Sequence, residues 1–269
     1  MTCIVHLSDL HFGCIQPSLT EPLIEAVNAA GAHAVAVSGD LTQRARTSQF
    51  RAARAFLDRI EAPVVVVPGN HDVPLFNPFL RLARPFARYR RWIDDRLESV
   101  HDLPGAVLVG LNTVDPWRHQ RGRIGEGGLA LACAAFAGGP SDRWKIVVAH
   151  HPFDQAPGSR KKLMRGAGAA AARLADCGAH LVLSGHLHSW RAEPFVETRG
   201  QRRMVQVHAG TGLSRRLRNE PNDFCVMRLD ADRLTIDRMA APPGATRFDR
   251  IERFAFRHTS MGWLPGGAT

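Results

Sequence analysis

Five short segments of this chain concentrate Asp, Asn and His, the side chains that bind metal ions through oxygen and nitrogen. The segments are Asp9-Leu10-His11, Gly39-Asp40, Gly69-Asn70-His71-Asp72, His150-His151-Pro152 and Gly185-His186-Leu187-His188. None of them contains cysteine, so the donor set favours Mn, Fe, Zn or Ni over a soft thiolate site. The set is too large for one tetrahedral zinc ion, and it suits two metal ions about 3.5–4 Å apart that share a carboxylate.

Each of these segments directly follows an apolar run that predicts a β-strand. The five predicted strands span residues 3–7, 34–38, 63–67, 145–149 and 180–184. In an α/β sheet, ligands bind beyond the carboxyl ends of the strands, so five such ends would bring these side chains together. Gly39, Gly69 and Gly185 suit the tight turns that deliver ligands there. A single His at a strand end is usually an ordinary polar residue, so the prediction depends on the five motifs occurring in this order.

The remaining pattern alternates β-branched runs with segments of helical periodicity. Helices are predicted at residues 21–30, 47–60, 86–99, 127–136 and 166–177, and further strands at 106–111, 204–208, 224–229 and 233–238. The last three strands have no helix between them and are expected to form a meander that completes a second sheet. The pattern predicts an α/β fold, a two-sheet β-sandwich flanked by helices. Residues 1–260 are expected to form a single domain and residues 261–269 a loose C-terminal tail.

Composition limits the class of protein and its partners. The 269 residues carry a net charge of +10, from 35 Lys and Arg against 25 Asp and Glu. This balance favours a phosphate substrate, nucleic acid or an anionic membrane surface, although an arginine-rich composition without functional meaning would look the same. No apolar run is long enough to span a membrane, and the first residues predict a strand, so we expect a cytoplasmic protein. The five cysteines are scattered without a CxxC pair, and no disulfide framework is expected.

The ordered motifs resemble those of the calcineurin-like metallophosphoesterase superfamily, and most closely its class III cyclic-nucleotide phosphodiesterase branch. The match extends from Asp9 to His188, about two-thirds of the chain. The resemblance implies that Asp9, His11 and His188 bind one metal ion, that Asn70, His150 and His186 bind a second, and that Asp40 bridges both. The ions would be Mn, Fe or Zn. Either His150 or His151 could supply the ligand from the His-His-Pro motif, and we favour His150 because it directly ends the strand.

The resemblance also implies a mechanism. Two metal ions lower the pKa of a shared water, and the resulting hydroxide attacks phosphorus. His71 is not a ligand in this family but lies over the substrate phosphate, where it would stabilise the phosphoryl oxygens or protonate the leaving group. Asp72 either orients His71 by accepting a ring N–H or caps the turn after Asn70.

The leading functional prediction is a phosphodiesterase acting on small phosphodiesters, with 3′,5′-cyclic nucleotides as one candidate. A diester is favoured because the motif loops contain no Lys or Arg that could stabilise the additional negative charge of a monoester. This argument fails if Arg191 or the Arg215–Arg218 cluster folds over the site. The first alternative is a lipid pyrophosphatase or phospholipid diesterase at an anionic membrane surface, suggested by the Arg- and Trp-bearing helix predicted at residues 86–99. A nuclease is less favoured, because aromatic residues for base stacking are scarce.

Overall fold

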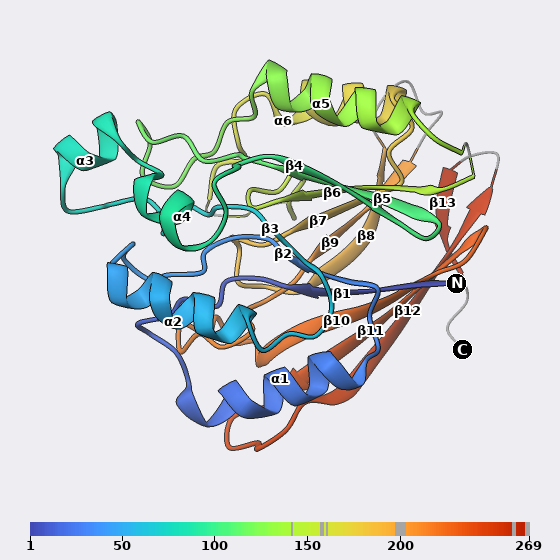
Figure 1. Cartoon of the computed structure of the whole chain (residues 1–269). Coiled ribbons are helices and arrows are strands. Elements are labelled where there is room, and N and C mark those ends of the chain that lie inside the picture. Colours follow the sequence, from blue (N-terminus) through green and yellow to red (C-terminus); the bar gives the residue numbers. More distant parts are fainter. Residues whose placement is uncertain (141, 157–158, 160, 197–202, 260–261, 267–269) are drawn as a thin grey trace.

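Two β-sheets pack face to face in the computed structural model, and helices cover both outer faces (Figure 1). The structure describes residues 1–140, 142–156, 159, 161–196, 203–259 and 262–266. Three apolar layers separate the four structural layers. One lies between the sheets, and each of the others lies between one sheet and its helices. The predicted two-sheet α/β fold is confirmed.

The first sheet has seven strands in the order β13-β12-β11-β10-β1-β2-β3. Their bounds are β1 Thr2–Leu7, β2 Ala34–Val37, β3 Val64–Val66, β10 Asn222–Leu229, β11 Arg233–Ala241, β12 Asp249–Thr259 and β13 Gly262–Pro265. β1, β2 and β3 run parallel, whereas β10 to β13 are antiparallel to their neighbours. The parallel strands therefore end at one edge of this sheet.

The second sheet has six strands in the order β4-β5-β6-β7-β9-β8. Their bounds are β4 Ser99–Leu103, β5 Ala106–Leu111, β6 Trp144–Ala149, β7 Leu181–Ser184, β8 Arg191–Val196 and β9 Arg203–His208. β5, β6, β7 and β9 are parallel, and β4 and β8 are antiparallel edge strands. Side chains alternate between the two faces, as β-geometry requires. In β5, Leu108 packs between the sheets, whereas Val107 and Val109 pack against helices.

Helices α1 (Thr20–Ala29) and α2 (Thr47–Leu57) cover the first sheet, and α5 (Glu126–Ala137) and α6 (Ala167–Asp176) cover the second (Figure 1). In α2 the apolar residues Phe50, Ala53, Phe56 and Leu57 recur at helical spacing and are all buried. A 3-10 helix η1 (Pro17–Leu19) precedes α1, and the short helices α3 (Pro78–Ala83) and α4 (Ala87–Trp92) lie beyond the strand ends. None of the helices in the described part of the chain has the length and apolarity to cross a membrane.

Three sequence predictions about secondary structure were wrong. The predicted helix at residues 86–99 is only α4, and β4 begins where that helix was expected to end. The predicted C-terminal meander is split, because β9 pairs with β7 in the second sheet whereas β10 pairs with β1 in the first. The segment from 262 to 265, predicted as loose tail, forms β13 on β12, and Trp263 is buried with its ring 4.6 Å from that of Trp144. Residues 267–269 lie outside the described residues.

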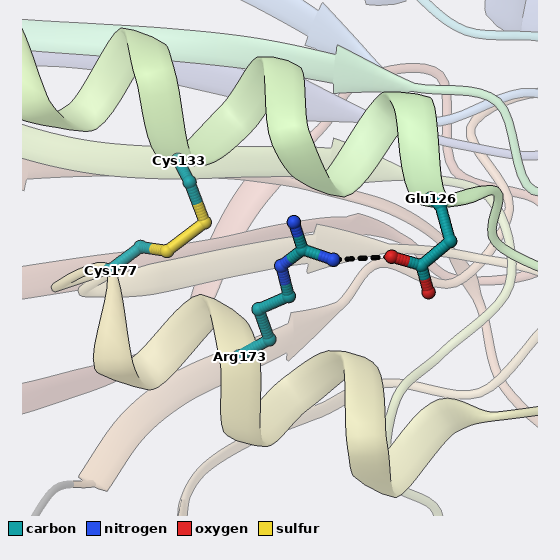
Figure 2. Close-up of a disulfide and its surroundings, with 4 residues drawn as sticks. All are labelled: Glu126, Cys133, Arg173 and Cys177. Atoms are coloured by element: carbon teal, nitrogen blue, oxygen red, sulfur yellow. Dashed lines mark hydrogen bonds and ion pairs between the residues drawn. A yellow bond between two sulfur atoms is a disulfide. The ribbon is translucent and has the colours of Figure 1, made fainter.

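A disulfide joins the two helices that cover the second sheet (Figure 2). Cys133 in α5 bonds to Cys177, which follows α6, across a sequence separation of 44 residues, and an Arg173–Glu126 ion pair joins the same two helices. The prediction that the cysteines form no disulfide was therefore wrong, because spacing along the chain does not reveal that α5 and α6 lie side by side. Disulfides persist mainly in oxidising compartments, so this bond is less typical of a cytoplasmic protein, which the sequence predicted.

Candidate metal centre

The Asp, Asn and His side chains of the five motifs meet at the carboxyl ends of the parallel strands. Asp9 and His11 follow β1, Asp40 follows β2, Asn70 follows β3, His150 follows β6, and His186 and His188 follow β7. All seven are buried. The two sheets contribute to one site because β1 to β3 and β6 to β7 end at the same edge, as the positions of the motifs after the strands predict.

The first cluster consists of Asp9, His11 and His188. The His188 Nε2 atom lies 3.1 Å and the His11 Nε2 atom 3.6 Å from Asp9 Oδ1, and the two nitrogens lie 3.1 Å apart. Ligand atoms bonded at 2.0–2.1 Å to one ion would lie about 3.0–3.4 Å apart. Asp9 Oδ1 is buried and has no hydrogen-bond partner. A buried carboxylate oxygen without a donor is costly unless a cation binds it, so the cluster fits a metal ion.

The second cluster consists of Asn70, His150 and His186. His150 Nε2 lies 3.2 Å from Asn70 Oδ1 and 3.2 Å from His186 Nδ1. Asp40 lies between the clusters, because its Oδ2 is 3.8 Å from His11 Nε2 and 3.5 Å from His150 Nε2. The other oxygen, Oδ1, accepts the backbone N–H of His71 at 2.7 Å. One oxygen is thus fixed by the chain, and the other faces both clusters.

In His150 and His188, a hydrogen bond from the other ring nitrogen fixes which nitrogen faces the cluster. His150 Nδ1 donates to the carbonyl of Ser38 at 2.8 Å, and His188 Nδ1 donates to the carbonyl of Arg216 at 3.0 Å. Each bond places the proton on Nδ1 and leaves the Nε2 lone pair toward the cluster, which is how proteins orient metal-bound histidines. Asp9 Oδ2 likewise accepts from Ser8 Oγ at 2.6 Å, so Oδ1 is the free oxygen.

His151 lies close to His150 and His186 but differs from them in its hydrogen bonds. Its Nε2 lies 3.0 Å from the carbonyl of Gln120, to which it must donate, and its Nδ1 accepts from Thr113 Oγ1 at 2.9 Å. Both ring nitrogens are therefore occupied. The arrangement supports His150 as the ligand of the His-His-Pro motif and gives His151 a different task, that of holding the loop at Gln120.

The backbone at the site adopts conformations that side chains rarely allow. Asp9, His11, Asp40, His186 and His188 have φ angles of 50°, 54°, 52°, 70° and 56°. Such left-handed conformations cost roughly 1–3 kcal/mol each, and they cluster at functional sites where the surroundings hold them. Gly185 shows how tightly the chain is packed here, because a Cβ at this position would overlap Ser8 Oγ and Asp9 Oδ2.

Burial and neighbouring charges shift the pKa values of Asp9, Asp40 and His186 toward the forms that bind metal ions. Burial alone would raise the pKa values of Asp9 and Asp40. His188 beside Asp9 and His150 beside Asp40 overcome this effect, so that both pKa values lie below their usual range. Burial lowers the pKa of His186 well below its usual value. Ionised carboxylates and neutral imidazole are the forms that bind metal ions.

His71 and Asp72 point in different directions. His71 Nδ1 lies 2.9 Å from the carbonyl of Gln43, to which it donates, and Nε2 lies 3.2 Å from Arg216 Nη1, from which it accepts. Burial lowers the pKa of His71 to about 4. Asp72 accepts from the backbone N–H groups of Leu41, Thr42 and Gly69 at 3.1, 2.8 and 2.9 Å. It therefore secures the loops after β2 and β3. The prediction that Asp72 orients the His71 ring is wrong, and the turn-capping alternative holds.

Basic side chains from distant segments border the site. Arg216 contacts His71, Arg44 Nη1 donates to the carbonyl of Gln43 beside His71 at 3.1 Å, and Lys161 Nζ donates to the carbonyl of His186. Burial lowers the pKa of Lys161 to about 8. The Arg215–Arg218 cluster thus does reach the site, and the premise of the diester prediction, a site without Lys or Arg, does not hold in the folded chain.

Sequence reasoning missed several positioning residues. Ser8 and Ser38 directly follow β1 and β2 and link the metal centre to His6, whose Nε2 lies 2.9 Å from Ser38 Oγ. His208 and Gln206 hold the loop after His150, because Gln206 Oε1 accepts the Phe153 N–H at 2.8 Å and its amide lies 2.8 Å from His208 Nε2. Serines at the ends of ligand-bearing strands were a visible signal, whereas the Gln206 contacts depend on tertiary packing.

These features define a two-sheet α/β protein with two adjacent groups of metal-ligating side chains. A model of the Calcineurin-like phosphoesterase family matches residues 3–190, and the chain belongs to this family. The resemblance to this superfamily that the motifs indicated is therefore confirmed. No curated protein matches the chain.

Two solved structures illustrate the fold. Purple acid phosphatase PPD1 from yellow lupin (Lupinus luteus) has a TM-score of 0.70 and 15% identity, over 94% of this chain and 53% of that one. This chain thus spans about half the length of the lupin protein. Vacuolar Protein Sorting 29 from Cryptosporidium parvum has a TM-score of 0.50 and 15% identity, over 95% and 98% of the two chains. At these identities the likeness shows the fold alone.

Proposed function

We propose that this chain hydrolyses phosphate esters at a dinuclear metal centre, with Asp9, His11 and His188 around one ion and Asn70, His150 and His186 around the other. The observation that carries the proposal is the position of Asp40 Oδ2, which lies 3.8 Å from a nitrogen of one cluster and 3.5 Å from a nitrogen of the other. When bound, two such ions supply a hydroxide near neutral pH and bind phosphoryl oxygens. The donors accept Mn, Fe or Zn, and metal availability decides among them.

The chain's own residues hold the substrate phosphate. Asp40 fixes the backbone of His71, and Gln43 fixes its ring through Nδ1. The remaining ring nitrogen, Nε2, holds the Arg216 guanidinium beside the site. A guanidinium offers several N–H donors to phosphoryl oxygens in a fixed plane. We therefore propose that His71 and Arg216 act as one unit, in which His71 positions Arg216 and Arg216 contacts the phosphate.

The charge around the site favours substrates more anionic than a simple diester. A monoester carries about one extra negative charge near neutral pH, and the cations of Arg216 and Lys161 would stabilise that charge in the bound substrate. Hydrolysis of small diesters, 3′,5′-cyclic nucleotides included, stays a prediction from the resemblance. We propose that p-nitrophenyl phosphate is cleaved with a kcat/KM at least equal to that of bis-p-nitrophenyl phosphate.

A hydrolysis panel tests these proposals. The Mn(II)-loaded protein is assayed with p-nitrophenyl phosphate, bis-p-nitrophenyl phosphate, cyclic AMP and a nucleotide–lipid pyrophosphate. Arg216→Gln should lower kcat/KM for the monoester more than for the diester. A protein that binds two metal ions and cleaves none of the substrates would refute the enzymatic function. A clear preference for the diester that Arg216→Gln leaves unchanged would refute the role of the cations.

A second candidate is action on a lipid phosphate or lipid pyrophosphate at an anionic membrane surface. Its original support, an amphipathic helix at residues 86–99, is absent, because α4 ends at Trp92. A different observation favours it: Phe76, Phe79 and Trp117 are 76%, 77% and 75% exposed. Arg81 in α3 brings these residues together, because it donates to the carbonyls of Pro116 and Arg118 on both sides of Trp117. Exposed aromatics beside basic residues are typical of membrane-surface binding.

Vesicle co-sedimentation tests this candidate. Phosphatidylglycerol vesicles should pellet the protein, and Phe76→Ser/Phe79→Ser should abolish pelleting. Ile251→Ser removes an exposed apolar side chain from β12 and serves as the control. Equal pelleting of both variants, or no pelleting of the unaltered protein, would exclude the membrane role.

A further inference from the structure

A basic cavity of about 460 Å³ opens beside the metal centre. Its lining includes five cations, Arg118, Arg121, Lys161, Lys162 and Arg165, together with His186, and none of its lining residues is acidic. The volume lies within the range of small-molecule sites. Because His186 belongs to both the cavity and the second metal cluster, a ligand in the cavity would lie next to the reacting phosphate.

These five cations have no acidic partner among the described residues, although several arginines elsewhere in the protein have one. Elsewhere, Arg238 pairs with Glu220 and Asp223, and Arg253 pairs with Asp237. Within the described ranges, none of the five cavity cations forms an ion pair with a carboxylate. A concave group of like charges without counter-charges raises the local concentration of anions and costs stability, so it favours an anionic ligand.

The cavity has two walls, a first formed by residues 118–121 and a second formed by Lys161, Lys162 and Arg165, and the buried Arg81 holds the first wall in place. Arg81 is 9% exposed and forms no ion pair among the described residues, yet it donates to the carbonyls of Pro116, Arg118 and Pro74 at 2.7, 2.7 and 3.1 Å. Burial lowers its pKa. A buried guanidinium used only on backbone carbonyls is costly, because charges lose hydration when they are buried. It fixes the loop that carries Arg118, so the cavity is formed before a ligand arrives.

Further hydrogen bonds join the two walls to each other and to the metal centre. Arg121 Nε donates to the carbonyl of Leu163 at 2.9 Å, and the Arg165 N–H donates to the carbonyl of Gly122 at 2.9 Å. His151 holds Gln120 in the first wall, and Lys161 in the second wall donates to the carbonyl of His186. The position of the cavity relative to the metal ligands is therefore fixed by the chain.

We infer that this cavity binds a second phosphate group of the substrate whose first phosphate reacts at the metal centre. The substrate class is thus an ester with two phosphate groups, as a bisphosphate or a diphosphate. The identity of the reacting group rests on the function proposed above, whereas the affinity of the cavity for phosphate does not.

Calorimetric titration of the metal-loaded full chain with pyrophosphate and with orthophosphate tests the cavity directly. Arg118→Gln/Arg165→Gln removes one cation from each wall, and both side chains are exposed, so the fold should be retained. Arg233→Gln/Arg257→Gln makes the same charge change at paired, exposed positions of β11 and β12 and serves as the control. The cavity variant should lose about 10-fold or more in pyrophosphate affinity and much less in orthophosphate affinity, since the removed cations can no longer form charge-assisted hydrogen bonds with a second phosphate. The control should match the unaltered protein. Equal affinities in all three proteins, or equal losses in both variants, would overturn the inference.

Phosphate release from fructose 1,6-bisphosphate and fructose 6-phosphate separates this inference from the proposed function. The unaltered protein should favour the bisphosphate, and the cavity variant should lose that preference. If pyrophosphate binding depends on the cavity cations but no ester is cleaved, the proposed function fails and the cavity remains an anion site for free polyphosphate. If esters are cleaved but neither binding nor preference responds to the cavity variant, the second phosphate site is excluded.

Discussion

Asp40→Asn removes the charge of the proposed bridging carboxylate but keeps nearly the same side-chain shape. Asp40 has a φ of 52°, a conformation that Asn tolerates as well as Asp, so the backbone should keep its path. The amide oxygen can still accept the His71 N–H, as Asp40 Oδ1 does at 2.7 Å. The amide nitrogen then faces His11 Nε2 and His150 Nε2, the lone pairs that the carboxylate oxygen faces at 3.8 and 3.5 Å. Only the ability to bridge two cations is lost.

The effect of Asp40→Asn is measured as the response of stability to metal. In the metal-free protein, burial and the neighbouring Asp9 oppose the charge of Asp40, but His150 and the other neighbouring histidines hold the pKa of Asp40 below its usual range. The metal-free variant loses a charge that the fold stabilises, so it should be less stable than the unaltered protein, and the comparison is therefore made on the rise in Tm that metal produces. Each ion at 100 times its Kd adds about 2.7 kcal/mol, so two add about 5 kcal/mol. At about 2–4 °C per kcal/mol, metal should raise the Tm of the unaltered protein by about 10–20 °C, and that of Asp40→Asn by at most about half as much.

Elemental analysis and thermal unfolding with and without Mn(II) measure these effects. The unaltered protein should hold two metal ions per chain, and Asp40→Asn should hold at most one and lose nearly all activity. Asp58→Asn makes the same charge change in an exposed ion pair with Arg54 and should behave like the unaltered protein. An Asp40→Asn protein that keeps two ions, the full metal-induced rise in Tm and near-native turnover would refute the bridging role.

Three further predictions concern catalysis, the disulfide and pH. His71→Ala should keep both metal ions and lose about 10²-fold in kcat to a similar extent on poor leaving groups and on p-nitrophenyl esters, because His71 positions Arg216; a much smaller loss on p-nitrophenyl esters would identify acid catalysis as its role. The unfolded, oxidised protein should titrate as three thiols and the reduced protein as five, and Cys133→Ser should lower the free energy of unfolding by about 4 kcal/mol for a closed loop of this length. Burial lowers the pKa of His208 to about 4, so below about pH 6.5 the unfolded chain takes up a proton there that the folded chain does not. The free energy of unfolding should therefore fall as the pH drops toward 4, and this residue alone should account for a loss of about 2 kcal/mol at pH 5. Chemical unfolding of the metal-free protein at several pH values measures this effect, and His208→Gln should remove this part of the pH dependence.

The sequence by itself determined the donors and the edge where they meet. Asp9, Asp40, Asn70, His150 and His186 each lie within a few residues of the end of an apolar strand, and the direction of a parallel strand fixes where its next residues lie. The two-sheet fold was predictable for a similar reason, because alternating strands and helices leave few ways to bury their apolar faces. These inferences depend only on local chain geometry.

The tertiary structure alone decided which distant groups surround those donors. Arg216 lies 145 residues from His71, and Lys161 lies 25 residues from His186, so no spacing in the sequence predicts either contact. The sequence favoured His150 as the ligand, but the bond from His151 to the carbonyl of Gln120 is a tertiary contact, and the disulfide required α5 and α6 to lie side by side. Such contacts form only when whole layers pack, and their energy depends on burial and on partners that local periodicity does not specify. Consequently the sequence indicates a two-metal phosphoesterase, whereas the charges that would choose its substrate are arranged by the fold.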